Sequence, residues 1–480
     1  EITVKDEPVF SDPPPARGSQ TGENKRPAIS VALANAGQNP TVTMSVGGKA
    51  VAPTYESGRV TYTPADDMTD GRVAVKVTAT RADGKSAEFS WFFTVGKTTY
   101  QPYFGQLHSH TQYSDGSGTL DSALSYIRSL PDSANVQFVA FTDHSNYFDS
   151  KNAPNVEAAL YDTSLVKDSD ASHSWKTYKD TIAQFNKDNA GDMVAIGGFE
   201  MTWSGGPGHI NTFNTPGIVS RNNSTLNNKT ADAGMKAYYA LLSQAEGATS
   251  ISQFNHPGTT FGNFKDFNYW DPVIDSRMYM VEVGNGEGQI GAGGYYPSYE
   301  QYIMALDKGW HLAPTNNQDN HKGKWGNAND ARDVILTDSF TEDGIYEAIR
   351  ALRMYATEDK NLELTYTVNG LMMGSSITEV PDKLNIEVTV NDPDASDSIA
   401  KVEVVANSGK VAYTWDNAAQ LKSGKLSVTL DPSYSYYFIR VTQKDGDLAV
   451  TSPVWVGESL KLGISNICLL YTSPSPRDCS

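Results

Sequence analysis

The chain has 480 residues, 39% of them hydrophobic, and a formal net charge of −18 at pH 7. This length exceeds what one hydrophobic core usually serves, so we expect about three domains. No apolar run approaches the roughly 18 residues that a membrane-spanning helix needs. Acidity that is spread through the chain repels phosphate backbones and disfavours binding to duplex nucleic acid, so an anionic substrate would have to be attracted locally, by metal.

The first predicted domain boundary lies near residue 26. Residues 12–26, DPPPARGSQTGENKR, have a linker composition, and we interpret 1–26 as a linker or the end of a preceding module. From 27 to 97, alternating segments such as TVTMSV and RVAVKVTAT are separated by turn residues. This pattern predicts an immunoglobulin-like β domain.

In the middle segment, 98–360, the spacing of hydrophobic residues differs from that of the β domain before it. Helical periodicity occurs in TLDSALSYIRSL and in TEDGIYEAIRALRMYA, which Thr341 can cap. Strand-like runs alternate with the helices, at 104–109, 137–142, 194–199, 209–214, 250–254, 278–283, 311–315 and 333–337. The alternation predicts an α/β fold, a parallel barrel with its site at the C-terminal ends of the strands.

A second β region follows at 361–457, with segments such as KLNIEVTVND and YYFIRVTQKDG, and predicts another immunoglobulin-like domain. Both cysteines lie in the tail, 458–480, whose composition departs from the body, and we interpret this tail as truncated or non-native. A cysteine-free body, β modules and strong acidity favour an exported bacterial protein, extracellular or at the cell surface. The β modules could associate with cell wall or carbohydrate.

Histidine is scarce, with eight residues, yet most histidines lie where a predicted strand meets its loop. In FGQLHSHTQYSDGSG, His108 and His110 are two positions apart, so on a strand both side chains point to one face. Further metal-capable residues follow other strands: His144, Glu200, His256, Asp319 and His321. His209 fits this placement least well. One such histidine alone would be structural, but the recurrence favours a metal cluster.

The ordered motifs HSHTQYSDGSG, FTDHS, GFE, GHIN, FNHPG and DNH resemble the polymerase and histidinol phosphatase (PHP) family. The branch that they most resemble contains secreted hydrolases related to a carbaryl hydrolase. The resemblance covers about 100–358 and implies a distorted (β/α)7 PHP barrel, here flanked by the two immunoglobulin-like modules. It also implies two or three divalent metal ions, of zinc, manganese or iron.

The resemblance implies a set of metal ligands shared among three ions. These would be His108, His110, Glu200 and Asp319 for the first ion, Glu200, His209 and His256 for the second, and Asp115, His144 and His321 for the third. Some family members have histidine where Asp115 stands, so the third site is expected to be weaker or to prefer a harder metal. Nitrogen and oxygen donors without a thiolate suit zinc, manganese and iron equally.

Clustered divalent metals predict hydrolysis, because they lower the pKa of a bridging water and neutralise charge that develops at phosphorus. We expect a metal-bridging hydroxide to cleave phosphoesters, with diesters favoured over monoesters or triesters, in a small-molecule or cell-surface anionic substrate. The catalytic residues would be Glu200, Asp319 and His321. Lys322 and Asn211 are adjacent to ligands and are candidates for holding substrate oxygens.

Two other functions stay open from the sequence. The same site could hydrolyse a carbamate, amide or sulfate ester, because a metal hydroxide attacks carbonyl and sulfuryl centres by the same logic. Alternatively, the middle segment is a metal-stabilised spacer in a surface adhesion protein; the large ligand set counts against this, since structural metal sites are usually closed and mononuclear. His173 and His311 are expected to be structural, and Asp143 to support the site without ligating metal.

Overall fold

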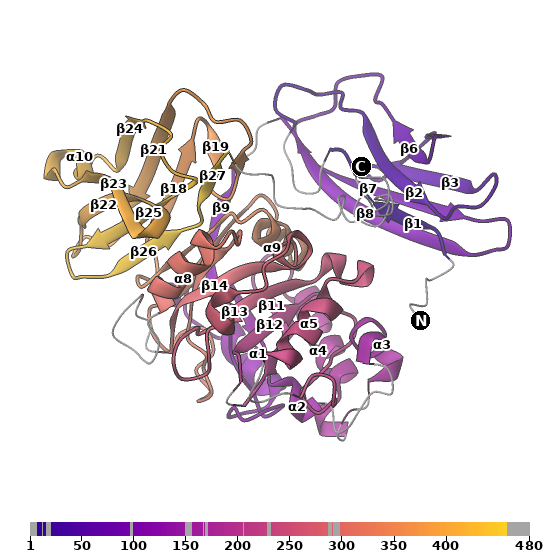
Figure 1. Ribbon diagram of the computed structural model, residues 1–480, viewed down its shortest axis with the longest axis horizontal. Coiled ribbons are helices and arrows are strands. Elements are labelled where there is room, and N and C mark those ends of the chain that lie inside the picture. The colour runs from indigo at the N-terminus through magenta and orange to yellow at the C-terminus, as the bar shows by residue number, and fades with distance from the viewer. Residues whose placement is uncertain are drawn as a thin grey trace, which may run out of the picture. The chain divides into compact units, whose positions relative to one another are not determined.

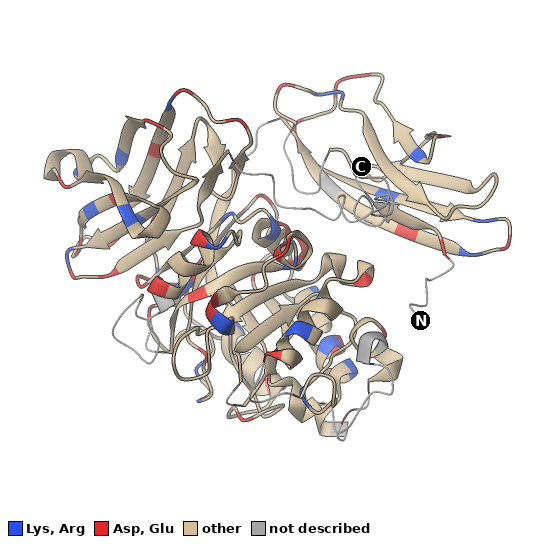
Figure 2. Cartoon of the chain, in the orientation of Figure 1, with Lys and Arg blue, Asp and Glu red and all other residues tan. Residues whose placement is uncertain are grey.

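The computed structural model describes residues 7–11, 13–15, 21–96, 99–148, 156–166, 168, 171–204, 206–227, 232–286, 290 and 298–457. These residues form two compact units, one up to Tyr100 and one from Gln101 onward (Figure 1). The predicted tail, 458–480, lies outside the described residues. Acidic and basic residues are scattered over helices, strands and loops of both units (Figure 2).

The first unit consists of two four-stranded antiparallel sheets that share one core. The first sheet has the order β1 (Val9–Ser11), β2 (Ile29–Ala34), β6 (Arg59–Tyr62), β5 (Thr54–Glu56), and the second β4 (Lys49–Val51), β3 (Thr41–Val46), β7 (Gly71–Thr80), β8 (Ser86–Val95). In β7, Val73, Val75, Val77 and Ala79 are buried while their neighbours are more exposed. The period-2 alternation thus buries one face of the strand.

The second unit is built on one continuous sheet of 15 strands. Its first part runs in the order β15 (Ala313–Asn317), β14 (Met278–Asn285), β13 (Ile251–Asn255), β12 (His209–Phe213), β11 (Val194–Thr202), β10 (Phe138–Phe141), β9 (Gln101–Gln106), β16 (Arg332–Thr337), β17 (Met354–Thr357). The sheet is curled, because the segments that follow β9 and β15 meet: His110 N donates to Asn320 O at 2.9 Å.

This curled half-barrel corrects the predicted (β/α)7 barrel, which is wrong. The pairs β11–β12, β12–β13, β9–β16 and β16–β17 are antiparallel, whereas a barrel of βα units needs parallel pairs. The reason lies in the connections. Only residues 203–208 join β11 to β12, too few for the crossover of a dozen or more residues that parallel neighbours require.

Some of the strands in the predicted C-terminal immunoglobulin-like module, 361–457, continue the same sheet. Ala356 of β17 pairs with Val450 of β26 (Leu448–Thr451), and the sheet extends through β25 (Tyr436–Gln443), β22 (Ile399–Ala406) and β23 (Lys410–Trp415). β27 (Val454–Val456) pairs with β25, and β20 (Ser376–Ile377) pairs with β27. A further four-stranded sheet has the order β19 (Leu371–Met372), β18 (Glu363–Val368), β21 (Leu384–Asn391), β24 (Lys425–Leu430).

Helices of the second unit begin where the sequence places caps. The Thr119 side chain accepts from Ser122 N at the start of α1 (Leu120–Arg128), and the Thr341 side chain accepts from Gly344 N at the start of α9 (Glu342–Arg350). The other helices are α2 (Ser145–Phe148), α3 (Val156–Tyr161), α4 (Trp175–Asp188), α5 (Ala233–Leu242), α6 (Phe264–Phe267), α7 (Pro272–Asp275), α8 (Ser298–Asp307) and α10 (Ala418–Lys422). No helix in the described ranges is both long and apolar enough to span a membrane.

Helix α8 links the two parts of the large sheet. It lies beside β14 and close to the C-terminal strands (Figure 1). Tyr436 Oη of β25 donates to Asp307 Oδ1 at 2.7 Å, and Arg440 of the same strand donates to Tyr299 Oη at 2.9 Å. The C-terminal strands are therefore joined to the preceding segment by side chains as well as by the backbone ladder.

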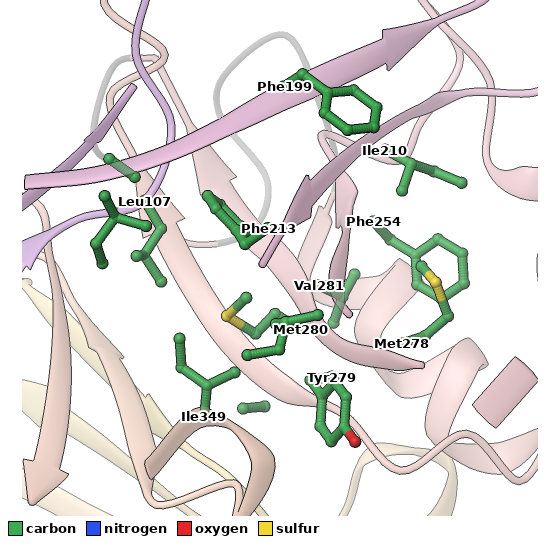
Figure 3. Close-up of a cluster of buried hydrophobic side chains, with 14 of the residues drawn as sticks. Leu107, Phe199, Ile210, Phe213, Phe254, Met278, Tyr279, Met280, Val281 and Ile349 are labelled. Carbon is green, nitrogen blue, oxygen red and sulfur yellow. The ribbon is translucent and has the colours of Figure 1, made fainter. Parts of the chain in front are cut away.

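A hydrophobic core covers one face of the strands that carry the histidines. Phe199 of β11, Ile210 of β12 and Phe254 of β13 are fully buried, and Ile349 of α9 belongs to the same cluster (Figure 3). Because neighbouring residues of a strand point to opposite faces, Glu200 points away from the core that Phe199 enters. The strand alternation thus separates an apolar face from a polar one.

Candidate metal centre

The nine residues predicted as metal ligands come together in the structure. His108 and His110 follow β9, His144 follows β10, and Glu200 and His209 lie on β11 and β12. The remaining ligands are loop residues beside their strands: Asp115, His256, Asp319 and His321. Most of them line one cavity of about 360 Å³, behind which His108 and His110 are fully buried.

The first group of candidate ligands surrounds one point. His108 Nε2 and His110 Nε2 are 3.2 Å apart, and Asp319 Oδ1 lies 3.1 Å from the first and 3.0 Å from the second. Glu200 Oε1 is 3.6 Å from His108 Nε2, and Glu200 Oε2 is 3.5 Å from His110 Nε2. Ligand atoms about 2.0–2.1 Å from a tetrahedral zinc ion lie about 3.4 Å from each other, which is the spacing found here.

Glu200 belongs to a second group as well. Its Oε1 lies 3.2 Å from His209 Nδ1 and 3.4 Å from His256 Nε2. These three residues could hold a metal ion, as could Glu200 with His108 and His110. Glu200 is therefore the carboxylate that two candidate sites share.

The third group lies nearer to solvent. Asp115 Oδ1 is 3.2 Å from His321 Nε2 and 3.5 Å from His144 Nε2. His110 completes the group, with Nδ1 3.9 Å from Asp115 Oδ1. The Asp115 side chain is 45% exposed, whereas His108, His110 and Glu200 are buried, so the third group is the most open of the three.

Apart from the contact between His108 Nε2 and His110 Nε2, several of the close polar atoms are not aligned as hydrogen bonds. Asp319 Oδ1 is buried within 3.1 Å of two imidazole nitrogens, yet it accepts no hydrogen bond. Both ring nitrogens of His209 are buried and also make none, although Nδ1 is 3.2 Å from Glu200. Atoms that converge without donor-to-acceptor alignment fit metal ligands directed at a common ion, so the residues present fit the implied metals.

Two ligands have backbone conformations that side-chain-bearing residues rarely adopt. His256 has φ of 29° and Asp319 has φ of 47°. Backbone strain of this kind persists where the surrounding structure requires it, and it is common at functional sites. Here it brings the residue after β13 and a residue after β15 into the cavity.

Protonation in the absence of metal follows the balance of burial and charge. Burial lowers the pKa of His108, but Asp319, Glu282 and Glu200 outweigh it, and the pKa is raised well above its ordinary value. Burial raises the pKa of Glu200, but His144, His108 and His209 hold it well below its usual range. In His209 burial prevails over Glu200, which lowers the pKa to about 4, so this imidazole is neutral at pH 7 and able to ligate.

The structure shows a buried carboxylate that sequence reasoning missed. Glu282 Oε1 lies 2.7 Å from His108 Nδ1, and Glu282 Oε2 accepts from His256 N at 2.7 Å and from Asn285 Nδ2 at 2.8 Å. It therefore orients two ligands without joining the cluster. A charged residue within the otherwise apolar MYMVEV run was the available signal.

Asn211, predicted to bind substrate, is connected to Glu200 through Asn255. It is fully buried, donates to Leu107 O at 3.2 Å and accepts from Asn255 Nδ2 at 2.8 Å. Asn255 Nδ2 also donates to Glu200 Oε1 at 3.0 Å. Asn211 shares one face of β12 with His209, two positions away, but it is fully buried and does not line the cavity. Its contact with substrate stays a prediction.

Lys322, the other predicted substrate contact, is exposed directly after His321, and its backbone N donates to Asn320 Oδ1 at 3.0 Å. Its role stays a prediction. Asp143 accepts from Thr111 N at 2.7 Å and from Ser114 Oγ at 2.6 Å, so it holds the loop between His110 and Asp115.

The two other histidines lie apart from the cluster. His311 Nδ1 is 2.8 Å from Asp275 Oδ2 and its ring packs near Trp455, while His173 lies beside Ser172 and Tyr113. These contacts fit the structural roles that we expected for both.

The cavity rim contains further residues that the sequence did not indicate. Thr202, Ser204 and Phe261 line the cavity. Arg221 donates to Ser204 Oγ and approaches Thr202 O at 3.5 Å. The ring of Phe261 lies 4.8 Å from that of His209 and covers one side of the site. Arg221 thus contacts two residues that line the cavity, and Phe261 forms an apolar part of the lining.

Comparison of the sequence with known proteins gives partial matches to uncharacterized proteins. No family model matches the chain. An uncharacterized protein of Chlamydia pneumoniae is 28% identical over 139 residues, and one of Chlamydia trachomatis serovar D is 23% identical over 139 residues. Each match covers 26% of this chain, and the chain spans only 22% of the length of these curated relatives.

Among solved structures, CopC from Methylosinus trichosporium OB3b matches 19% of this chain and 94% of its own, with 18% identity and a TM-score of 0.16. A putative glycoside hydrolase from Bacteroides vulgatus matches 93% of this chain and 98% of its own, with 8% identity and a TM-score of 0.22. Likenesses with such low TM-scores carry no argument about this chain.

Proposed function

We propose that the protein is a metal-dependent hydrolase that cleaves phosphoesters, with diesters favoured. The observation that carries the proposal is the convergence of nine nitrogen- and oxygen-bearing side chains, from six strands and their loops, around Glu200; seven of them line one cavity of about 360 Å³. The proposal rests on this site and not on the barrel that the sequence resemblance implied.

Two or three divalent ions, zinc, manganese or iron, would fit the three overlapping groups. When bound, such ions activate a water molecule as nucleophile and neutralise negative charge that develops on the substrate. The side chains of the protein would hold these ions in place. Glu200 is shared by the first and second groups, Asp319 and the His108–His110 pair belong to the first, and His321 and Asp115 belong to the third.

Other residues prepare the cavity for an anionic ester. Phe261 beside His209 and His256 excludes water from one side of the site, which strengthens electrostatic interactions there. Arg221, at the rim, presents a guanidinium whose planar donors match phosphate oxygens. A positive group at the opening of an acidic protein favours an anionic substrate over a neutral carbamate.

The open cavity argues against a purely structural metal site. Structural zinc sites are closed by four protein ligands, whereas catalytic sites keep a position for water or substrate. Here His209, His256 and Asp319 line the cavity together with Thr202 and Ser204. Substrate-sized volume next to the candidate ligands is what a hydrolase needs and a spacer does not.

The test is a substrate panel on metal-loaded protein. Phosphate monoesters, diesters and triesters, a sulfate ester and an aryl carbamate are assayed side by side, with chelator-treated and metal-restored samples. We expect diesters to turn over fastest, and activity to disappear with the chelator and return with metal. His311→Gln is the matched control, because it changes a buried histidine outside the cluster. Turnover of the carbamate alone would refute phosphoester hydrolysis.

A further inference from the structure

A second group of carboxylates lies in the C-terminal part of the large unit and shares no residue with the metal centre. Asp359 follows β17, while Asp392 and Asp394 lie after β21. One oxygen of each lies within 4.8 Å of the others. Asp397, from the same loop, contributes a fourth carboxylate near this group.

The basic side chain with a charge interaction with this group is Arg332, which acts on Asp359 without forming a salt bridge with it. Within the described ranges, no lysine or arginine forms a salt bridge with Asp359, Asp392, Asp394 or Asp397, although Lys401 and Arg440 on the neighbouring strands both pair with Glu403. Carboxylates this close repel one another. Their mutual approach calls for a compensating positive charge.

The terminal amide of Gln443 lies among the carboxylates and is independent evidence for a ligand. Its Nε2 donates to Asp359 Oδ2 at 2.8 Å, to Asp392 Oδ2 at 3.1 Å and to Asp397 Oδ2 at 3.3 Å. Gln443 is only 2% exposed, and its Oε1 is buried without a hydrogen-bond partner. A buried amide oxygen without a partner destabilises the folded state.

Asn361 repeats this arrangement. Its Nδ2 donates to Asp394 Oδ1 at 3.0 Å, while its Oδ1 is buried and accepts no hydrogen bond. In both residues, a rotation of the amide by 180° about the last side-chain bond would place the oxygen where the nitrogen now meets the carboxylates. With a cation between them, all of these oxygens would be satisfied together.

We infer that Asp359, Asp392, Asp394, Asp397 and the Gln443 amide oxygen form a calcium site. Calcium binds six to eight oxygen ligands about 2.4 Å away, so two ligands on opposite sides of the ion are about 4.8 Å apart. The three grouped carboxylates meet that limit. An all-oxygen, carboxylate-rich set selects a hard cation over the softer metals that imidazole binds.

The ion would join three segments that are distant in sequence. Asp359 follows β17, from which the sheet continues into the C-terminal strands; the other aspartates lie in the β21–β22 connection, and Gln443 ends β25. Calcium would therefore stabilise the attachment of the C-terminal strands. The segment NDPDASDS, 391–398, with aspartates at 392, 394 and 397, carries most of the ligands.

The test is titration of the full chain with CaCl₂, after treatment with chelator, by calorimetry and thermal unfolding. We expect one equivalent to bind and the Tm to rise by several degrees in about 1 mM calcium. Asp392→Asn/Asp394→Asn should weaken binding at least tenfold, and Gln443→Met should also weaken it. The control Glu379→Gln/Asp382→Asn removes the same charge from exposed positions and should bind as the wild type does.

The double aspartate variant has opposite expected effects in two buffers. Without calcium it should unfold at a higher temperature than the wild type, because like charges are removed; in calcium the wild type should be the more stable. No saturable calcium binding by the wild type would overturn the inference, as would full binding by the double variant. Magnesium saturating the site as tightly as calcium would overturn the choice of ion.

Discussion

Glu282 Oε1 lies 2.7 Å from His108 Nδ1, and this contact turns His108 Nε2 toward Asp319 and Glu200. A carboxylate on β14 thereby fixes the ring orientation of a ligand that follows β9. The same residue accepts from the backbone N of His256, whose φ is 29°. Glu282 thus positions ligands of two candidate sites at once.

Glu282→Gln should therefore weaken metal binding and turnover about 10–100-fold while leaving the fold intact, because supporting partners of metal ligands have effects of this size. Metal stoichiometry and kcat measure the effect, and circular dichroism checks the fold. Asp275→Asn is a close control, since Asp275 makes a similar 2.8 Å contact with His311 outside the cluster. Equal metal loss in both variants would contradict a specific role for Glu282.

Glu200→Gln should be the most damaging single change at the cluster. The substitution keeps the shape but removes the negative charge that two candidate sites share, so both metals should weaken together. Asp115→Asn should instead lose only the more open third metal and leave measurable activity. Elemental analysis measures the metal content of both variants, and a turnover assay measures their activity. Full metal content with a near-normal rate in Glu200→Gln would refute the shared-ligand arrangement.

Arg221 at the cavity rim should bind the charged substrate. Arg221→Gln should raise KM for an anionic diester about 10-fold or more, as expected for loss of a hydrogen bond to a charged group, with a smaller change in kcat. For a neutral aryl carbamate the variant should behave like the wild type. The steady-state constants of both substrates test this, and an equal KM increase for both would assign Arg221 a structural role.

The amine of Lys179 should make the free energy of unfolding depend on pH. Burial lowers its pKa more than Glu342 raises it, and Nζ donates to Gly197 O at 3.1 Å. The unfolded chain therefore binds the Lys179 proton more tightly than the folded chain does. The free energy of unfolding should rise with pH between the lowered pKa and about 10.4 because of this group.

Urea unfolding of the wild type and of Lys179→Met, from pH 8 to pH 10.5, isolates this contribution. The stability of the wild type relative to the variant should increase with pH across that range. A constant or falling difference would contradict the lowered pKa of Lys179.

The sequence indicated the candidate ligands because most of them lie at or near a strand end. His108 and His110 share a face by simple alternation, and His144, His256 and Asp319 follow their strands within a few residues. The direction of one strand relative to the next does not follow from the residues within either strand. The six residues between Thr202 and His209 reverse the chain, whereas we interpreted the two strands as successive βα units. The shortness of this connection was the signal for an antiparallel pair.

The supporting residues were harder to find for a different reason. Glu282 and Asn255 lie in fully buried strands, where a polar residue is visible in the sequence but its partner is not. His108 is 174 positions from Glu282 along the chain. Such a pairing depends on the order of strands in the sheet, and alternation patterns give the face of a residue but not its neighbouring strand. The same limit hid the pairing of β17 with β26.

That pairing decides where the chain can be cut. Removing everything after residue 360 would expose the backbone edge of β17, whose Tyr355, Ala356 and Thr357 pair with β26. Unprotected edges of this kind join to other chains and cause aggregation. The smallest fragment that keeps the candidate metal ligands on a protected sheet therefore extends through the C-terminal strands to about residue 457.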